Sequence, residues 1–139
     1  LGWACWKTYL GQPETDANRS LSLLMLGDAL NSNERPEEAL PVLEASLALT
    51  RRHWSDIGHA ILVGQASIAI CLDKLGRHDE ALGLRREIYD SRAATLGISH
   101  EYTIQDGNSL STSLMNFKRW DEAISLSRDQ LLPAARQSL

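Results

Sequence analysis

The chain has 139 residues, of which 43% are apolar and 23% charged, and its formal net charge is -4 at pH 7. A length of about 100 to 200 residues suits one compact domain or a short run of repeats, and the composition excludes a disordered chain. The negative net charge argues against nucleic-acid binding, which depends on clustered Lys and Arg side chains.

Two cysteines, Cys5 and Cys71, have neither a Cys-x-x-Cys spacing nor histidine partners at a zinc-ligand spacing. They are therefore predicted to be buried thiols of an intracellular protein in a reducing compartment. Residues 57–72 are the longest stretch without Asp, Glu, Lys or Arg. This stretch is shorter than the roughly 18 apolar residues that a membrane span needs, so we expect no membrane insertion.

A seven-residue segment recurs three times at a spacing of 42 residues. It reads Glu-Arg-Pro-Glu-Glu-Ala-Leu at 34–40, Gly-Arg-His-Asp-Glu-Ala-Leu at 76–82 and Lys-Arg-Trp-Asp-Glu-Ala-Ile at 118–124. A fixed period of this length is typical of solenoid proteins, in which each repeat packs against its neighbours. The sequence therefore predicts three stacked repeats.

Each copy has a small residue twelve positions before its shared alanine, namely Gly27, Ala69 or Ser111. An aliphatic residue precedes each small residue and a leucine follows it by three positions, a spacing that predicts a helix before each turn. Small side chains let two helices approach closely. We therefore expect each small residue to face the shared alanine of the second helix in its copy.

In chain order, residues 1–10 are predicted to be the end of a helix that completes a preceding hairpin. Residues 17–54, 59–96 and 100–138 are then predicted to form three helical hairpins, each with a turn before its acidic segment.

Two details of the second helices can also be predicted. Pro133 lies inside the last helix and is expected to kink it, because proline cannot donate an internal hydrogen bond. The second helix of the middle hairpin is predicted to bury a stripe at helical spacing, formed by Ala81, Leu84, Ile88, Ser91 and Thr95.

These repeats resemble the tetratricopeptide repeat, in its longer 42-residue form typified by kinesin light chains. Glu-Glu-Ala-Leu-Pro at 37–41 is similar to the start of that family's second helix, and Leu-Gly-Ile-Ser-His at 96–100 is similar to its inter-repeat linker. Glu101 stands where that linker usually has proline. The resemblance implies an all-α fold, a right-handed superhelical solenoid of antiparallel helix hairpins, here a fragment of a longer array.

The resemblance also implies a non-enzymatic scaffold that binds a partner peptide or helix in a concave groove lined by the first helix of each repeat. Asn108 matches the asparagine with which the family holds peptide backbones, whereas the Lys and Asn set of its chaperone-binding members is absent. The predicted groove residues grade from apolar to polar along the array, and they are Leu21, Leu24, Met25, Asp28, Asn31, Val63, Ala66, Ser67, Ile70, Asp73, Lys74, Gln105, Asn108, Ser109, Thr112, Met115 and Asn116.

Two other functions fit the sequence. One is a structural subunit of a multiprotein complex that contacts its neighbours through its second helices, its loops and the end carrying Trp3 and Trp6. The other is a regulatory array joined to an enzyme.

No catalytic site is expected in the chain itself. No nucleophile motif or phosphate-binding loop is present, and the four histidines form no pair at metal-ligand spacing. We therefore expect a protein partner and no nucleic acid, small-molecule substrate, metal or cofactor. The four histidines, for which structural roles are expected, are His53, His59, His78 and His100.

Overall fold

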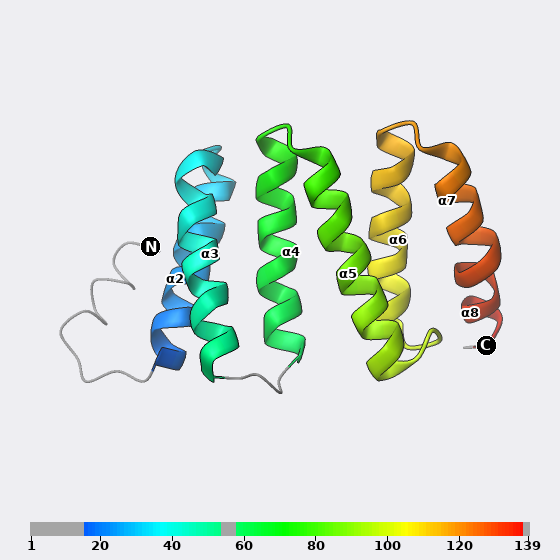
Figure 1. Cartoon of the computed structure of the whole chain (residues 1–139), viewed down its shortest axis with the longest axis horizontal. Helices are drawn as coiled ribbons and strands as arrows, with labels where there is room; N and C mark the ends of the chain where they lie inside the picture. Colours follow the sequence, from blue (N-terminus) through cyan, green and yellow to red (C-terminus); the bar gives the residue numbers. More distant parts are fainter. Residues whose placement is uncertain (1–15, 54–57, 138–139) are drawn as a thin grey trace. The chain divides into compact units, whose positions relative to one another are not determined.

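The computed structural model of the chain describes residues 16–53 and 58–137, and these residues form helices joined by turns (Figure 1). The prediction of an all-α fold is confirmed. The predictions for residues 1–10, which include Trp3, Trp6 and Cys5, lie outside the described residues.

The first unit, Leu1–Arg77, contains three described helices, and the second unit, His78–Leu139, contains the rest. The two helices of the predicted middle hairpin belong to different units, so the predicted contact between Ala69 and Ala81 stays a prediction. In the first unit the helices are α2 (Asp16–Ser32), α3 (Pro36–His53) and α4 (Gly58–Lys74). In the second they are α5 (His78–Leu96), α6 (Glu101–Asn116), α7 (Trp120–Leu126), the π-helix η1 (Ser127–Leu131) and α8 (Leu132–Gln137).

The turn before each acidic segment has the same hydrogen bonds in all three copies. After α2, the amide of Arg35 donates to the carbonyl of Leu30 at 2.9 Å, and Arg77 and Arg119 make the matching bond at 2.8 Å. This bond belongs to the Schellman motif, which needs a residue with positive φ after the helix. That residue is Glu34, Gly76 or Lys118, with φ of 57°, 79° and 60°.

We expect Lys118→Gly to raise the free energy of unfolding by about 0.5–1 kcal/mol, because the left-handed conformation is strained for residues with a Cβ and free of strain for glycine. Urea denaturation followed by circular dichroism measures the change. Asn116→Gly is the control, since this residue is the last of α6 and the change should lower the free energy of unfolding by about 0.3 kcal/mol. A loss of stability in Lys118→Gly would contradict the assigned turn.

In the first unit, α2 packs against α3 and α3 packs against α4. Gly27 is buried against Leu43, and a Cβ built on this glycine would come 2.5 Å from Leu43 Cγ. Leu43 lies one turn after Ala39 on α3. Leu43 is therefore the nearest neighbour of Gly27 across the two helices, and the predicted contact with Ala39 stays a prediction.

Three buried hydroxyl groups join the N-terminal part of α2 to the C-terminal part of α3. Ser20 Oγ donates to the carbonyl of Ser46 at 3.0 Å, and Ser46 Oγ donates to the carbonyl of Ser20 at 2.7 Å. Thr50 Oγ1 also lies within hydrogen-bonding distance of Ser20 Oγ. These bonds satisfy polar groups that would otherwise be costly to bury.

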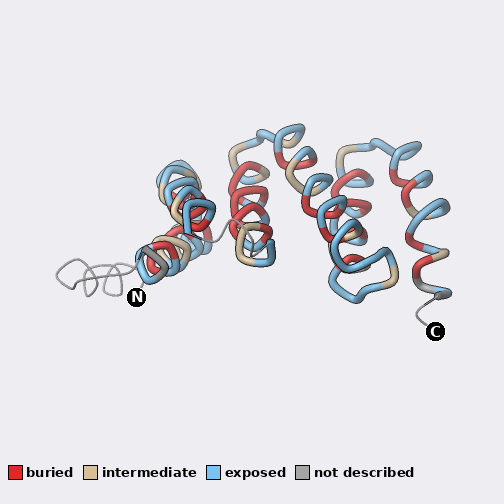
Figure 2. The backbone as a smooth tube through the Cα atoms, turned by 60° about the horizontal axis from the view of Figure 1, so that its bottom comes forward, coloured by how far each residue is buried: buried red, intermediate tan, exposed pale blue. Residues whose placement is uncertain are grey.

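In the second unit, α5 packs against α6 and α6 packs against α7. The buried residues recur at helical spacing along these helices (Figure 2). Phe117 packs against the core, and its ring lies 4.0 Å from that of His78. The core cluster is formed by Leu82, Tyr89, Leu110, Leu114, Ala123, Leu126 and Leu131.

The predicted buried stripe of α5 is partly wrong. Ala81 and Ile88 are buried, but Ser91 and Thr95 are exposed. Arg92 continues the buried face instead, because its guanidinium forms an ion pair with Asp106 at 2.6 Å. A paired and partly desolvated arginine can occupy such a position, which an apolar pattern does not reveal.

Two local features follow from single residues. Pro133 stands just after the π-helical turn, in which the amide of Leu132 donates to the carbonyl of Ser127. The wider turn accommodates a residue that lacks a backbone donor. His100 is the N-cap of α6, and its Nδ1 accepts from the amide of Tyr102 at 3.2 Å, so this histidine has the structural role predicted for it.

Candidate functional site

Large apolar side chains are exposed on α2 and α4, the first helices of the first and second repeats. Leu21 and Met25 are one turn apart on α2 and are 56% and 47% exposed. On α4, Val63 and Ile70 are exposed by 36% and 49% and lie two turns apart. The two helices contact each other. We call these four residues the apolar groove patch.

Two of the predicted groove residues do not line an open surface. Asn31 and Ser67 are buried, and Asn31 Nδ2 donates to the carbonyl of Ser67 at 3.4 Å. Lys74 Nζ donates to the carbonyl of Asn31 at 2.6 Å and pairs with Glu34 at 2.8 Å. These residues therefore hold α2 and α4 together and thereby position the patch beside them.

The remaining predicted residues of α2 and α4 surround the patch. Asp28 and Ala66 are exposed, and Leu24 and Asp73 are half-buried. Asp28 and Asp73 are acidic, so the surroundings of the patch are both apolar and negatively charged. Such a surface suits a partner that carries apolar anchors and basic side chains.

The predicted groove residues of α6 are all exposed, and their face of the helix is mainly polar. Asn108 lies in the middle of it, and its carbonyl accepts from Thr112 Oγ1 at 2.9 Å. At one end, Gln105 donates to Glu101 at 3.2 Å. The six residues on this face are Gln105, Asn108, Ser109, Thr112, Met115 and Asn116. Their amides and hydroxyls can donate to and accept from a peptide backbone.

In the described residues, no group of three His, Cys, Asp or Glu side chains could hold a metal ion. Burial raises the pKa of the Cys71 thiol, and the nearby carboxylate of Glu44 adds to the rise. Burial also raises the pKa of Tyr89, with a contribution from Asp90. Both groups thus stay protonated and neutral near pH 7, as expected for core side chains.

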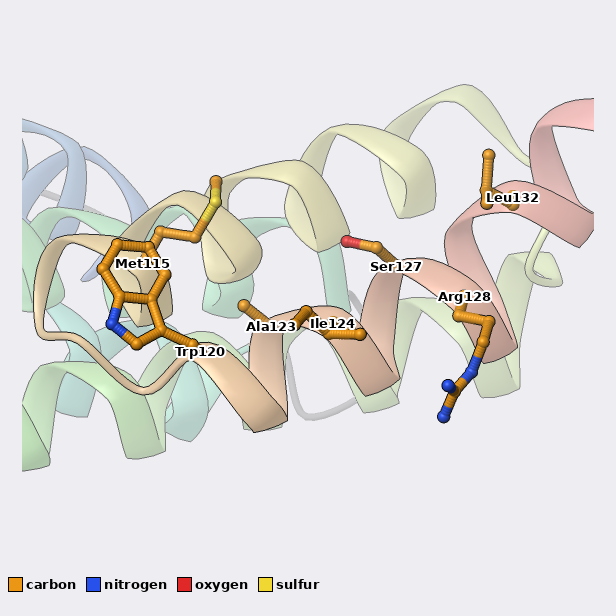
Figure 3. A pocket seen from close by; sticks show the side chains of 7 residues that line it. All are labelled: Met115, Trp120, Ala123, Ile124, Ser127, Arg128 and Leu132. Atoms are coloured by element: carbon orange, nitrogen blue, oxygen red, sulfur yellow. The ribbon is translucent and has the colours of Figure 1, made fainter.

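A further apolar surface was not predicted. Trp120, Ile124 and Leu132 are exposed on α7 and α8, and with Met115 they line a pocket (Figure 3). The second helices were expected to bind only in the alternative of a structural subunit, and Trp120, Ile124 and Leu132 were not singled out as binding residues. The sequence signal for this surface was the spacing of Trp120, Ile124 and Leu132. Successive members are four and eight residues apart, which places them along one helix face.

The chain is similar to known repeat proteins. Residues 20–53 match the tetratricopeptide repeat family, and no curated protein matches the chain. Two solved structures with a similar fold are both of a putative kinesin light chain with nearly identical TPR-like repeats from Podosopora anserina, one of them a single-residue variant. They are 22% identical to this chain, cover 92% and 91% of it, and give TM-scores of 0.71 and 0.70. This chain spans 59% of the length of each. Separately, none of the described helices is long and apolar enough to cross a membrane.

Proposed function

We propose that this chain, a tetratricopeptide repeat protein whose fold is like that of kinesin light chain repeats, holds a partner peptide or helix on the exposed faces of α2, α4 and α6. The repeat fold is in general a protein-interaction scaffold, and such proteins are typically not enzymes. Beyond this general role, we assign partner binding to the exposed faces of these three helices. A groove that continues over both units stays a prediction.

The observation that carries the proposal is the apolar groove patch. Leu21 and Ile70 are about half exposed, although each lies on a helix whose other side is buried. Clustered apolar side chains on a folded surface cost solubility and often mark a binding site. An amphipathic helix or an extended segment would cover them with its own apolar anchors.

The polar face of α6 has a complementary role in the proposal. An extended peptide leaves its backbone amides and carbonyls unpaired, and Asn108 offers one acceptor and two donors for them. Because Asn108 is exposed, its truncation should leave the fold intact. Loss of the Asn108 side chain should therefore weaken partner binding and not the fold.

Affinity capture from native lysate tests this function. We expect Ile70→Glu with Asn108→Ala to reduce recovery of the specific partner by about tenfold or more, because a charge replaces an apolar anchor. Quantitative mass spectrometry measures recovery against the wild type. Circular dichroism must show the same helix content for both proteins.

The matched control is Ile98→Glu, which places the same charge at an exposed isoleucine between α5 and α6. It should recover the partner normally. Equal recovery by the double variant and the wild type would exclude the groove surface. It would favour the other candidate, a structural subunit that uses its second helices, for which the exposed Trp120 and Ile124 of α7 are a specific observation.

A further inference from the structure

The described C-terminal helices carry an apolar surface that shares only Met115 with the proposed groove. Trp120 and Ile124 are 53% and 56% exposed on α7, and Leu132 extends the same face onto α8. With Met115 at the end of α6 they line a pocket of about 290 Å³. Trp120 and Met115 lie together at one end of the pocket and Leu132 lies at the other (Figure 3). We call these four residues the terminal face.

The repeat shows what covers this face elsewhere in the same chain. Two periods earlier, Asn31 and Pro36 occupy the positions of Met115 and Trp120. Helix α4 lies against both of them there, because Asn31 Nδ2 donates to the carbonyl of Ser67 and Cys71 Sγ donates to the carbonyl of Pro36 at 3.1 Å. In the first repeat a helix thus covers the positions equivalent to Met115 and Trp120.

Two positions that border the face carry opposite charges in the two copies. In the first repeat the border carries two acids: Glu34, which pairs with Lys74 of the covering helix at 2.8 Å, and Glu44, which acts on the Cys71 thiol of that helix. Their equivalents two periods later are Lys118 and Arg128. Both are exposed, and the contact of Arg128 with its neighbour Asp129 at 3.2 Å is a surface ion pair that is worth little.

We propose that the terminal face binds an acidic amphipathic helix of a partner protein. Its aliphatic stripe would cover Trp120, Ile124 and Leu132, and its Asp or Glu side chains would meet Lys118 and Arg128. The proposed occupant differs in charge from α4, the helix that covers the first repeat, since a Lys at the position of Lys74 would face Lys118. Like charges placed together at an interface disfavour the wrong partner.

Two designed peptides test the proposal on the full chain. Both are 18-residue fluorescent helices with the same Leu and Ala stripe, and their other positions are glutamate in one and lysine in the other. We expect the acidic peptide to bind about tenfold more tightly by fluorescence anisotropy. The net charge of -4 on the whole chain favours the basic peptide, so this order requires the local basic border.

Variants assign the binding to the terminal face. Ile124→Glu and, separately, Trp120→Ala should each weaken binding of the acidic peptide by about tenfold, and both sites are exposed enough for the fold to persist. Lys118→Glu combined with Arg128→Glu should reverse the peptide preference. Ile98→Glu and the groove variant Ile70→Glu should bind as the wild type does, which separates this surface from the proposed groove.

Three results would overturn the proposal. One is tighter binding of the basic peptide by the wild type. Another is unchanged binding of the acidic peptide by both Ile124→Glu and Trp120→Ala. The third is a concentration-dependent dimer in sedimentation that Ile124→Glu abolishes, because the occupant would then be a second copy of this chain.

Discussion

Gly27→Val is expected to lower the free energy of unfolding of the first unit by about 2–3 kcal/mol, as measured by urea denaturation. Gly27 is buried on α2, and a Cβ at this position would overlap Leu43 Cδ2 and lie 2.5 Å from Leu43 Cγ. Leu43 is only 1% exposed and cannot move away without disturbing its other contacts. Overpacking of this kind costs about 1–3 kcal/mol or more, which outweighs the gain of about 0.5 kcal/mol from replacing a helical glycine.

The matched control is Gly83→Val on α5. Gly83 is exposed, and a Cβ there would meet nothing within 4 Å. Its replacement should change the free energy of unfolding by less than about 0.5 kcal/mol, in the stabilising direction. Equal effects at Gly27 and Gly83 would show that α2 and α3 do not approach as described.

A double variant tests which side chain the valine meets. Leu43→Ala alone should cost about 2–5 kcal/mol, because it leaves a cavity. Gly27→Val combined with Leu43→Ala should cost clearly less than the sum of the single changes, since the new methyl groups fill that cavity. The third repeat supports this pairing: Ser111 and Ser127 occupy the equivalent positions, and their Oγ atoms lie 3.3 Å apart.

The second large effect is expected at the ion pair between α5 and α6. Arg92 is 8% exposed, its Nε lies 2.6 Å from Asp106 Oδ2, and its guanidinium lies 5.2 Å from the centre of the Tyr102 ring. Arg92→Met should cost about 2–3 kcal/mol, since it leaves a partly buried carboxylate without its partner. This is below the usual loss for a fully buried pair, because the Asp106 side chain keeps 24% of its exposure.

Removing both charges separates pairing from packing. Arg92→Met with Asp106→Leu should recover most of the lost stability, because apolar replacement of a buried pair is often neutral. The comparison uses urea denaturation of the two single variants, the double variant and the wild type. If Arg92→Met alone cost less than about 0.5 kcal/mol, the pair would have no more weight than a surface pair.

Much of the fold could be predicted because the same turn occurs in each of the three repeats. The turn residues Glu34, Gly76 and Lys118 recur every 42 residues, and this spacing predicted all three turns. In the structure, the amide of the arginine after each of them donates the same backbone hydrogen bond. The resemblance to tetratricopeptide repeats is likewise confirmed. The sequence did not name Leu43 as the nearest neighbour of Gly27, because periodicity defines a helix face but not how far one helix slides along another.

The candidate site was less predictable. Register alone placed Asn31 and Ser67 on the groove, but their hydrogen bond buries both. Burial of a polar side chain depends on a partner that is distant in sequence, which a repeat pattern does not name. The terminal face was not predicted as a site, although the spacing of Trp120, Ile124 and Leu132 places these exposed side chains along one helix face.

Hydrogen–deuterium exchange of the free chain and of its complex with a captured partner is the most direct test of the scaffold function. If the partner lies on the first helices, its binding should slow exchange in peptides from α2, α4 and α6 and leave those from α3 and α5 unchanged. Slower exchange confined to α3, α5 and α7 would contradict this account and show that the second helices hold the partner.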